Sequence, residues 1–216
     1  MVDFTIGTIL GHLVLALRWT VALSLIAFVG GAALGLLMLV IRIAKLPGAQ
    51  AGVGLYVQVF QGTPLLMQMF LAYFGLALLG VKTSALMAAS VCLTLYASAY
   101  LTEIWRGCVE AVPRGQWEAS ASLALNLREQ LRHVILPQAG RIAIAPTVGF
   151  LVQVVKGTAL ASVIGFIEVT KAGQMIANAT FQPFIAYGLV GLMYFALCFP
   201  LSLWSRQLER RLRIAR

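Results

Sequence analysis

WTVALSLIAFVGGAALGLLMLVI, residues 19–41, carries no ionisable side chain along its whole length. A helix needs about 20 apolar residues to cross the hydrocarbon core of a bilayer, so this stretch predicts a membrane-spanning helix. Further long apolar stretches predict spans at approximately 54–80, 83–105, 142–165 and 184–205. They are apolar on every face instead of alternating, which argues against the strands of an outer-membrane barrel.

The composition of the whole chain agrees with a lipid environment. Of the 216 residues, 61% are hydrophobic and 11% are charged, whereas ordinary soluble domains are about half apolar and a quarter charged. The formal net charge of +9 could indicate nucleic acid binding, but the cations flank the spans instead of gathering on one soluble face. We therefore expect an all-α membrane protein of five spans, one transmembrane domain over 1–216, and no nucleic acid partner.

The positions of the cations predict the orientation. Most of the 16 Lys and Arg residues lie in 42–45, 106–141 and 206–216. The positive-inside rule places these segments in the cytoplasm, so the N-terminus is expected outside and the C-terminal tail, 206–216, inside. Apolar residues between 4 and 17 share one helical face, and this segment is either an interfacial helix or a lead-in to the first span.

The cytoplasmic loop 107–140 is longer than most connections between neighbouring helices. A turn is expected at Val112–Gly115, and apolar spacing predicts one amphipathic helix from Trp117 to Leu131. Pro137 is expected to end the unit. A short helix under a membrane domain suits either docking of another protein or a peripheral cap at the lipid headgroups.

Several motifs resemble one family. Glu118-Ala119-Ser120, followed by Ala124 and by Ile135-Leu136-Pro137, resembles the EAA loop of permease subunits in bacterial ABC importers. FQGTPLL at 60–66, AYLTEIWRG at 99–107 and KGTALA at 156–161 resemble motifs of the polar amino acid permeases. The resemblance covers roughly 53–170 in detail.

The resemblance implies a type I ABC importer permease of MetI-like architecture in the bacterial inner membrane. It implies a second permease subunit, identical or different, a cytoplasmic ATPase dimer that binds ATP and Mg, and an extracytoplasmic binding protein that delivers an amino acid. The chain itself is then expected to bind no cofactor or metal and to catalyse no reaction. Independently, it lacks the G-x-x-x-x-G-K-[ST] phosphate loop of P-loop ATPases.

Two other classes of membrane protein would carry different sequence features. An ion- or proton-coupled secondary transporter or channel should show an intramembrane carboxylate relay or inverted repeats with broken helices, and the sequence shows neither. A membrane scaffold would need no interrupted span and no cation within a span.

The resemblance also assigns contacts with the ATPase. The expected contact residues are Glu118, Ala119, Ser120, Ala124, Leu125 and Arg128. Ala124 stands where the family has glycine, and alanine favours a helix by roughly 1 kcal/mol over glycine, so we expect a continuous coupling helix there. Glu118 either meets the ATPase or is an ordinary acid in the first helical turn.

Lys156 is the cation deepest within an expected span. Charged groups in that region normally face protein or a watery cavity, so Lys156 is either the partner of a substrate carboxylate or a structural lysine held by an ion pair or by backbone carbonyls. Gly62-Thr63-Pro64 interrupts the second span, and free carbonyls at membrane depth are tolerated when they line a cavity. The other expected polar groups of the path are Gln61, Thr63, Gln68, Gln153 and Thr158. The stretch from Gln58 to Gln68 could instead form interhelical hydrogen bonds between subunits.

Structural roles are expected for Pro64 at the break, for Pro137, and for Glu103 with Arg106, which share a helical face at i,i+3. The family often has Asp where Gly157 stands. A cationic side chain would favour such an acidic partner, so we expect a neutral or acidic polar L-amino acid as substrate. Alternatively, this subunit is the partner that holds no substrate in a heterodimer.

Overall fold

The computed structural model describes residues 5–44 and 48–214, and all regular structure in these ranges is helical. The elements in chain order are α1 (Ile6–Ile43), α2 (Ala49–Gly62), α3 (Leu65–Phe70), η1 (Leu71–Gly75), α4 (Leu76–Leu78), α5 (Ala85–Glu110), α6 (Arg114–Ser122), α7 (Leu127–Glu129), η2 (Gln130–Ile135), α8 (Leu136–Gly157), η3 (Thr158–Ser162), α9 (Val169–Thr180) and α10 (Pro183–Ile214).

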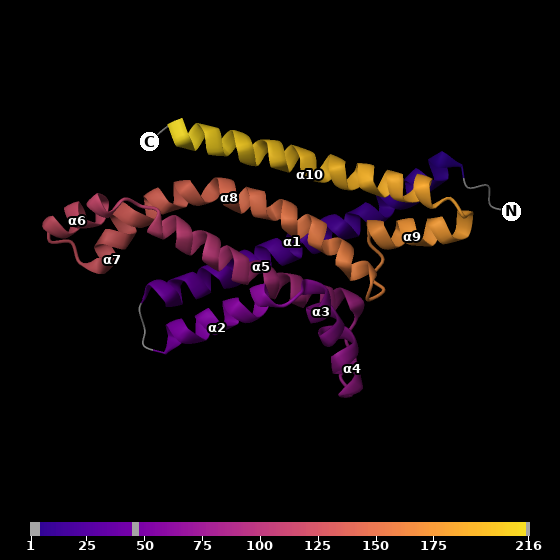
Figure 1. The fold of residues 1–216 in the computed structure, drawn as a ribbon, viewed down its shortest axis with the longest axis horizontal. Helices are drawn as coiled ribbons and strands as arrows, with labels where there is room; N and C mark the ends of the chain where they lie inside the picture. Colours follow the sequence, from indigo (N-terminus) through magenta and orange to yellow (C-terminus); the bar gives the residue numbers. More distant parts are fainter. Residues whose placement is uncertain (1–4, 45–47, 215–216) are drawn as a thin grey trace.

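Four long helical stretches are long and apolar enough to cross a membrane: Ile6–Ile43, Ala85–Glu110, Leu127–Ser162 and Pro183–Arg211. A fifth span would combine α2 with the helical stretch Leu65–Leu78, which is bent by 99° from it. The long helices lie along the molecule, with α6 and α7 at one end and α9 at the other (Figure 1). The all-α class and a count of four to five spans agree with the expectation from the sequence.

The boundaries differ from the expected spans in three places. Helix α1 begins at Ile6 with Thr5 as its N-cap, so the described part of the N-terminal segment is a lead-in to the first span. Helix α8, which corresponds to the fourth expected span, ends at Gly157, and the chain continues as the 3₁₀ turn η3 to Ser162. Helix α9 was not expected, and it packs with Val169 and Ile176 against the start of α1.

Helices α1 and α5 form the most extensive helix–helix packing within the described residues. Ala27, Gly31 and Gly35 recur at i, i+4 and i+8 on the buried face of α1. A Cβ on Gly31 would lie 2.5 Å from the Cβ of Ala97. The Thr102 hydroxyl donates to the Gly35 carbonyl at 3.2 Å. Small residues at such spacing let two membrane helices approach closely, which is the main attraction available between helices in lipid.

Gly31→Leu should therefore separate α1 from α5 and destabilise the protein by about 1–3 kcal/mol, because the added side chain overpacks a filled interface. The measurement is the thermal unfolding midpoint in mild detergent. Gly11→Leu is the matched control, since Gly11 lies on the same helix with nothing within 4 Å of its Cβ position. Equal midpoints for the two variants would contradict this account of the packing.

Candidate functional site

The segment α6–α7–η2 projects from one end of the helical bundle, and its base is firmly packed. Val109 and Val112 from the end of α5 form a buried cluster with Ile135 and Ala139, and Trp117 and Leu131 pack against it. Gln138 of α8 donates to the Gln116 side-chain oxygen at 3.2 Å. The projecting segment is thus held by the ends of α5 and α8.

The expected continuous helix from Trp117 to Leu131 is wrong. Helix α6 ends at Ser122, and Ala124 has a φ of +56°. The Leu125 amide donates to the Ser120 carbonyl, and the Ala124 amide donates to the Ala121 carbonyl. This is the Schellman arrangement, in which a left-handed residue closes a helix. Ala124 therefore adopts the conformation that glycine favours, because two backbone hydrogen bonds and the following cap hold it there.

The chain restarts its helix directly after this turn. The Asn126 side chain accepts from the Glu129 amide at 3.1 Å, and the Glu129 carboxylate accepts from the Asn126 amide at 2.8 Å. This reciprocal capping box satisfies amides that would otherwise be free. It sets the direction of α7, so the tip of the segment is a helix–turn–helix with a defined shape.

The expected contact residues differ in exposure. Glu118, Ala119, Ala124 and Arg128 are exposed, and Leu125 is partly buried. Ser120 is buried and its hydroxyl donates to the Trp117 carbonyl, so it braces the segment from inside. Leu123, which the sequence analysis did not single out, is 76% exposed at the tip.

Pro137 does not end the segment as expected. The chain passes from α7 through the π-helical turn η2 directly into α8, and Pro137 lies in the first turn of α8. Proline is tolerated in a first turn because its missing N–H would have no essential role there. The π-turn shifts the bonding to i→i−5, with the Leu136 amide donating to the Leu131 carbonyl. The segment is consequently continuous with a membrane-spanning helix.

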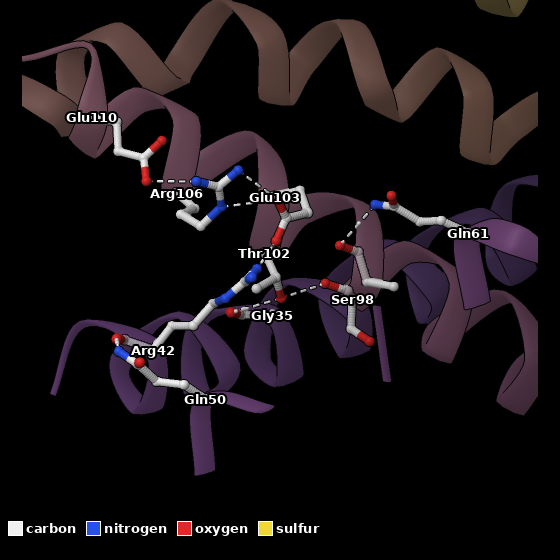
Figure 2. A network of polar contacts seen from close by, with 10 residues as sticks. Gly35, Arg42, Gln50, Gln61, Ser98, Thr102, Glu103, Arg106 and Glu110 are labelled. Atoms are coloured by element: carbon white, nitrogen blue, oxygen red, sulfur yellow. Dashed lines mark hydrogen bonds and ion pairs between the residues drawn. The ribbon is translucent and has the colours of Figure 1, made fainter. Parts of the chain in front are cut away.

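A polar network joins α1 to the end of α5 near this segment (Figure 2). Glu103 pairs with Arg106 at 2.8 Å, the i,i+3 pair expected from the sequence, and also with Arg42 of α1. Arg106 continues to Glu110 at 2.5 Å. The side chains of Arg42 and Glu103 are about one quarter exposed, and a shared carboxylate of this kind contributes more than an isolated surface pair. Lys45, the other cation expected here, lies outside the described residues.

The break between α2 and α3 is closed by its own polar side chains. The Thr63 hydroxyl donates to the Val59 carbonyl at 2.7 Å, and the Gln68 amide group donates to the Phe60 carbonyl at 3.1 Å. Gln61 donates across to the Ala99 carbonyl of α5 at 3.3 Å. In this conformation Thr63 and Gln68 therefore satisfy carbonyls that the break leaves free, and Gln61 adds a hydrogen bond to a carbonyl within α5. The Gln68 side-chain oxygen is buried without a partner within the described residues.

Lys156 and Gln153 lie three residues apart on α8 and both are exposed. No ion pair within residues 5–44 and 48–214 includes Lys156, so the structural ion-pair role finds no support there. Thr158 is fully buried, and its hydroxyl donates to the Val155 carbonyl. The structure therefore leaves Gln153 and Lys156 available to a ligand or partner, and it turns Thr158 inward.

A buried carboxylate escaped the sequence analysis. Glu168 is fully buried and caps α9 by accepting from the Lys171 amide at 3.0 Å. It also accepts from the Tyr194 hydroxyl of α10 at 2.8 Å and the Thr20 hydroxyl of α1 at 3.3 Å. Burial raises the pKa of Glu168, and the hydrogen-bond donors around it oppose that rise. The sequence carried no standard cap signal here, because Glu is not among the residues that mark a helix N-cap.

The sequence matches a known protein family and several named relatives. The family model described as "Binding-protein-dependent transport system inner membrane component" matches residues 49–214. The chain is 31% identical over 200 residues to the probable amino-acid ABC transporter permease protein YckA of Bacillus subtilis (strain 168), covering 93% of this chain and 88% of that protein. It is 33% identical over 193 residues to the probable glutamine ABC transporter permease protein GlnM of the same organism, covering 89% of each.

A solved structure shares the fold. The crystal structure of an amino acid ABC transporter with histidines matches with a TM-score of 0.92 at 30% identity, covering 98% of this chain and 99% of that one.

Ala124→Gly should stabilise the turn of the projecting segment by about 1 kcal/mol, because glycine accepts positive φ without the steric cost that alanine carries. Hydrogen exchange of the amides in 120–126 should slow about fivefold, which corresponds to that energy. Ala121→Gly is the control. It lies inside α6, where glycine is unfavourable, and should speed exchange. Unchanged or faster exchange in Ala124→Gly would show that Ala124 is not strained.

Proposed function

The chain belongs to the binding-protein-dependent transport system inner membrane components, the permease subunits of ABC importers, and from that premise we propose that it is the membrane-spanning subunit of an ATP-driven amino acid importer. It is a multi-pass inner membrane protein. The observation that carries the mechanism is the projecting segment, whose tip is exposed while its base is buried between α5 and α8. A displacement of the tip would therefore be transmitted through the packed base to α5 and α8.

The tip is the proposed docking site of a cytoplasmic ATPase, which binds the ATP and Mg. Glu118, Ala119, Leu123, Ala124 and Arg128 present an exposed surface of mixed charged and apolar character. Helix–helix docking of this kind suits a segment of fixed shape, because little conformational entropy is lost when a rigid surface binds. Closure of the ATPase would then rock the spans as rigid bodies.

We propose a cytoplasmic location for the C-terminus and the projecting segment, and an outside location for the N-terminus. The last turns of α10 and helix α6 lie toward the same end of the molecule, and the first turns of α1 lie near α9 at the other end (Figure 1). Arg42, Arg106 and Arg114 also lie at the end with the projecting segment. The positive-inside rule favours the cytoplasm for that end.

The translocation path is proposed to form with a second permease subunit, identical or different. Exposed Gln153 and Lys156 would be costly against lipid, so a partner subunit or a watery cavity is expected to cover them. The ammonium of Lys156 suits the carboxylate of an amino acid delivered by an extracytoplasmic binding protein. The relative named for glutamine is consistent with a neutral or acidic polar substrate.

The function is tested by purifying the chain from its native membrane in mild detergent and reconstituting what is retained. We expect an ATPase to co-purify, and we expect vesicles supplied with the binding protein to accumulate a radiolabelled amino acid only when ATP is inside. L-glutamine, L-glutamate and L-arginine distinguish the substrate classes. Uptake that follows an ion gradient and is indifferent to ATP would establish a secondary transporter instead.

Lys156→Ala should lower amino acid uptake at saturating binding protein by about tenfold, as expected for loss of a charge-assisted hydrogen bond. Lys156→Arg keeps the charge and should retain most of the rate. Both rates are measured in the vesicle assay above, normalised to the amount of assembled complex. Equal uptake by the alanine variant and the wild type would show that Lys156 does not contact the substrate during transport.

A further inference from the structure

An open pocket of about 290 Å³ lies between η3, the start of α9 and the first turns of α10. It is lined by Ser162, Val163, Thr170, Lys171, Gln174 and Tyr187. Its volume is just below the range of about 300–1,000 Å³ that is common for sites of drug-sized ligands. The pocket is therefore suited to a small solute.

The polar groups of this pocket complement both charged ends of a zwitterion. Lys171 is partly buried, and its ammonium donates to the Gln174 side-chain oxygen at 2.9 Å. The ammonium offers donors to a carboxylate, and the Gln174 oxygen offers an acceptor to an amine. One cation and one amide acceptor, adjacent on α9, are the groups that an α-amino acid backbone needs.

The remaining hydrogen bonds fix the start of α9 beside the pocket. The Lys171 amide is occupied by Glu168, and the Thr170 hydroxyl contacts the Tyr194 hydroxyl at 3.2 Å. Glu168 is fully buried, so its carboxylate is not a competing partner on the pocket surface. The α9 backbone is thereby fixed at the point from which the Lys171 side chain extends.

The pocket is adjacent to the segment that carries Lys156. Ser162 is the last residue of η3, which follows α8 directly, so it lies about 10 Å along the chain from Lys156 at the rise of such helices. Helix α9, which supplies Thr170, Lys171 and Gln174 to the pocket, lies at the end of the molecule opposite the projecting segment (Figure 1). In the proposed orientation this end faces the side from which the substrate arrives.

We infer that the pocket of Lys171 and Gln174 is an entrance site that receives the carboxylate and amine of an amino acid before it reaches Lys156. The inference rests on the proposed function. The simpler alternative is that Lys171 and Gln174 are an ordinary i,i+3 surface pair, and a second alternative is that Lys171 contacts the binding protein.

The test is vesicle uptake by Lys171→Ala complexes, measured over a series of binding-protein concentrations. The probe is radiolabelled L-glutamine, L-glutamate or L-arginine, whichever the wild-type vesicles accumulate. We expect the maximal rate to fall about fivefold. The concentration of binding protein that gives half of the maximal rate should not change. Lys171→Arg should restore most of the maximal rate because it retains the charge. Lys82→Ala is the matched control, since Lys82 is an exposed lysine in the loop before α5 and does not line the pocket.

Three results would overturn the inference. If Lys171→Ala changes neither the maximal rate nor the half-maximal concentration of binding protein, Lys171 and Gln174 are an ordinary surface pair. A higher half-maximal concentration of binding protein, with an unchanged maximal rate, assigns Lys171 to binding-protein contact. If wild-type vesicles show no ATP-dependent uptake, the proposed function fails and the entrance site fails with it. The first two results leave the proposed function intact.

Discussion

Lipid offers no hydrogen bonds, and this constraint governs the structure because every backbone polar group at membrane depth needs a partner within the protein. Long uninterrupted helices satisfy it automatically. Where the chain departs from a helix, nearby polar side chains take over. Thr63 and Gln68 donate hydrogen bonds to the carbonyls left free at the α2–α3 break. Glu168 accepts a hydrogen bond from the Lys171 amide at the start of α9. At these two places polar residues accompany irregular backbone, and irregular backbone at membrane depth is tolerated where it is buried in protein or lines a cavity.

Helix α5 connects the middle of the molecule to the projecting segment (Figure 1). Its middle packs against the glycines of α1, and Ser98 and Thr102 add hydrogen bonds to Tyr56 and to the Gly35 carbonyl. Its end carries Glu103 and Arg106 and enters the base of the projecting segment. A displacement of that segment therefore acts on α5, and α5 cannot move independently of α1 because their interface is filled. The polar network at Glu103 secures the same pair of helices where the membrane ends.

Much of the fold and part of the candidate site could be predicted from the sequence. Apolar length identified the spans, and the i,i+3 spacing identified the Glu103–Arg106 pair. Local propensity failed at Ala124, because hydrogen bonds to the Ser120 and Ala121 carbonyls outweigh the preference of one residue. The start of α9 was missed because the partners of Glu168, Thr20 and Tyr194, are 148 and 26 residues distant. Contacts at such separations leave no periodic pattern in the sequence.

The electrostatics near α9 follow from the same buried carboxylate. A helix N-terminus attracts anions through its free amides and its dipole, and α9 would offer such a site if its cap were neutral and open. Glu168 occupies it instead, and its carboxyl group accepts the Lys171 amide that an anion would otherwise bind. An incoming carboxylate therefore finds no attraction from the backbone of α9. The attraction at this end of α9 must come from the ammonium of Lys171, whose amide binds Glu168 on the buried side while its side chain lines the pocket.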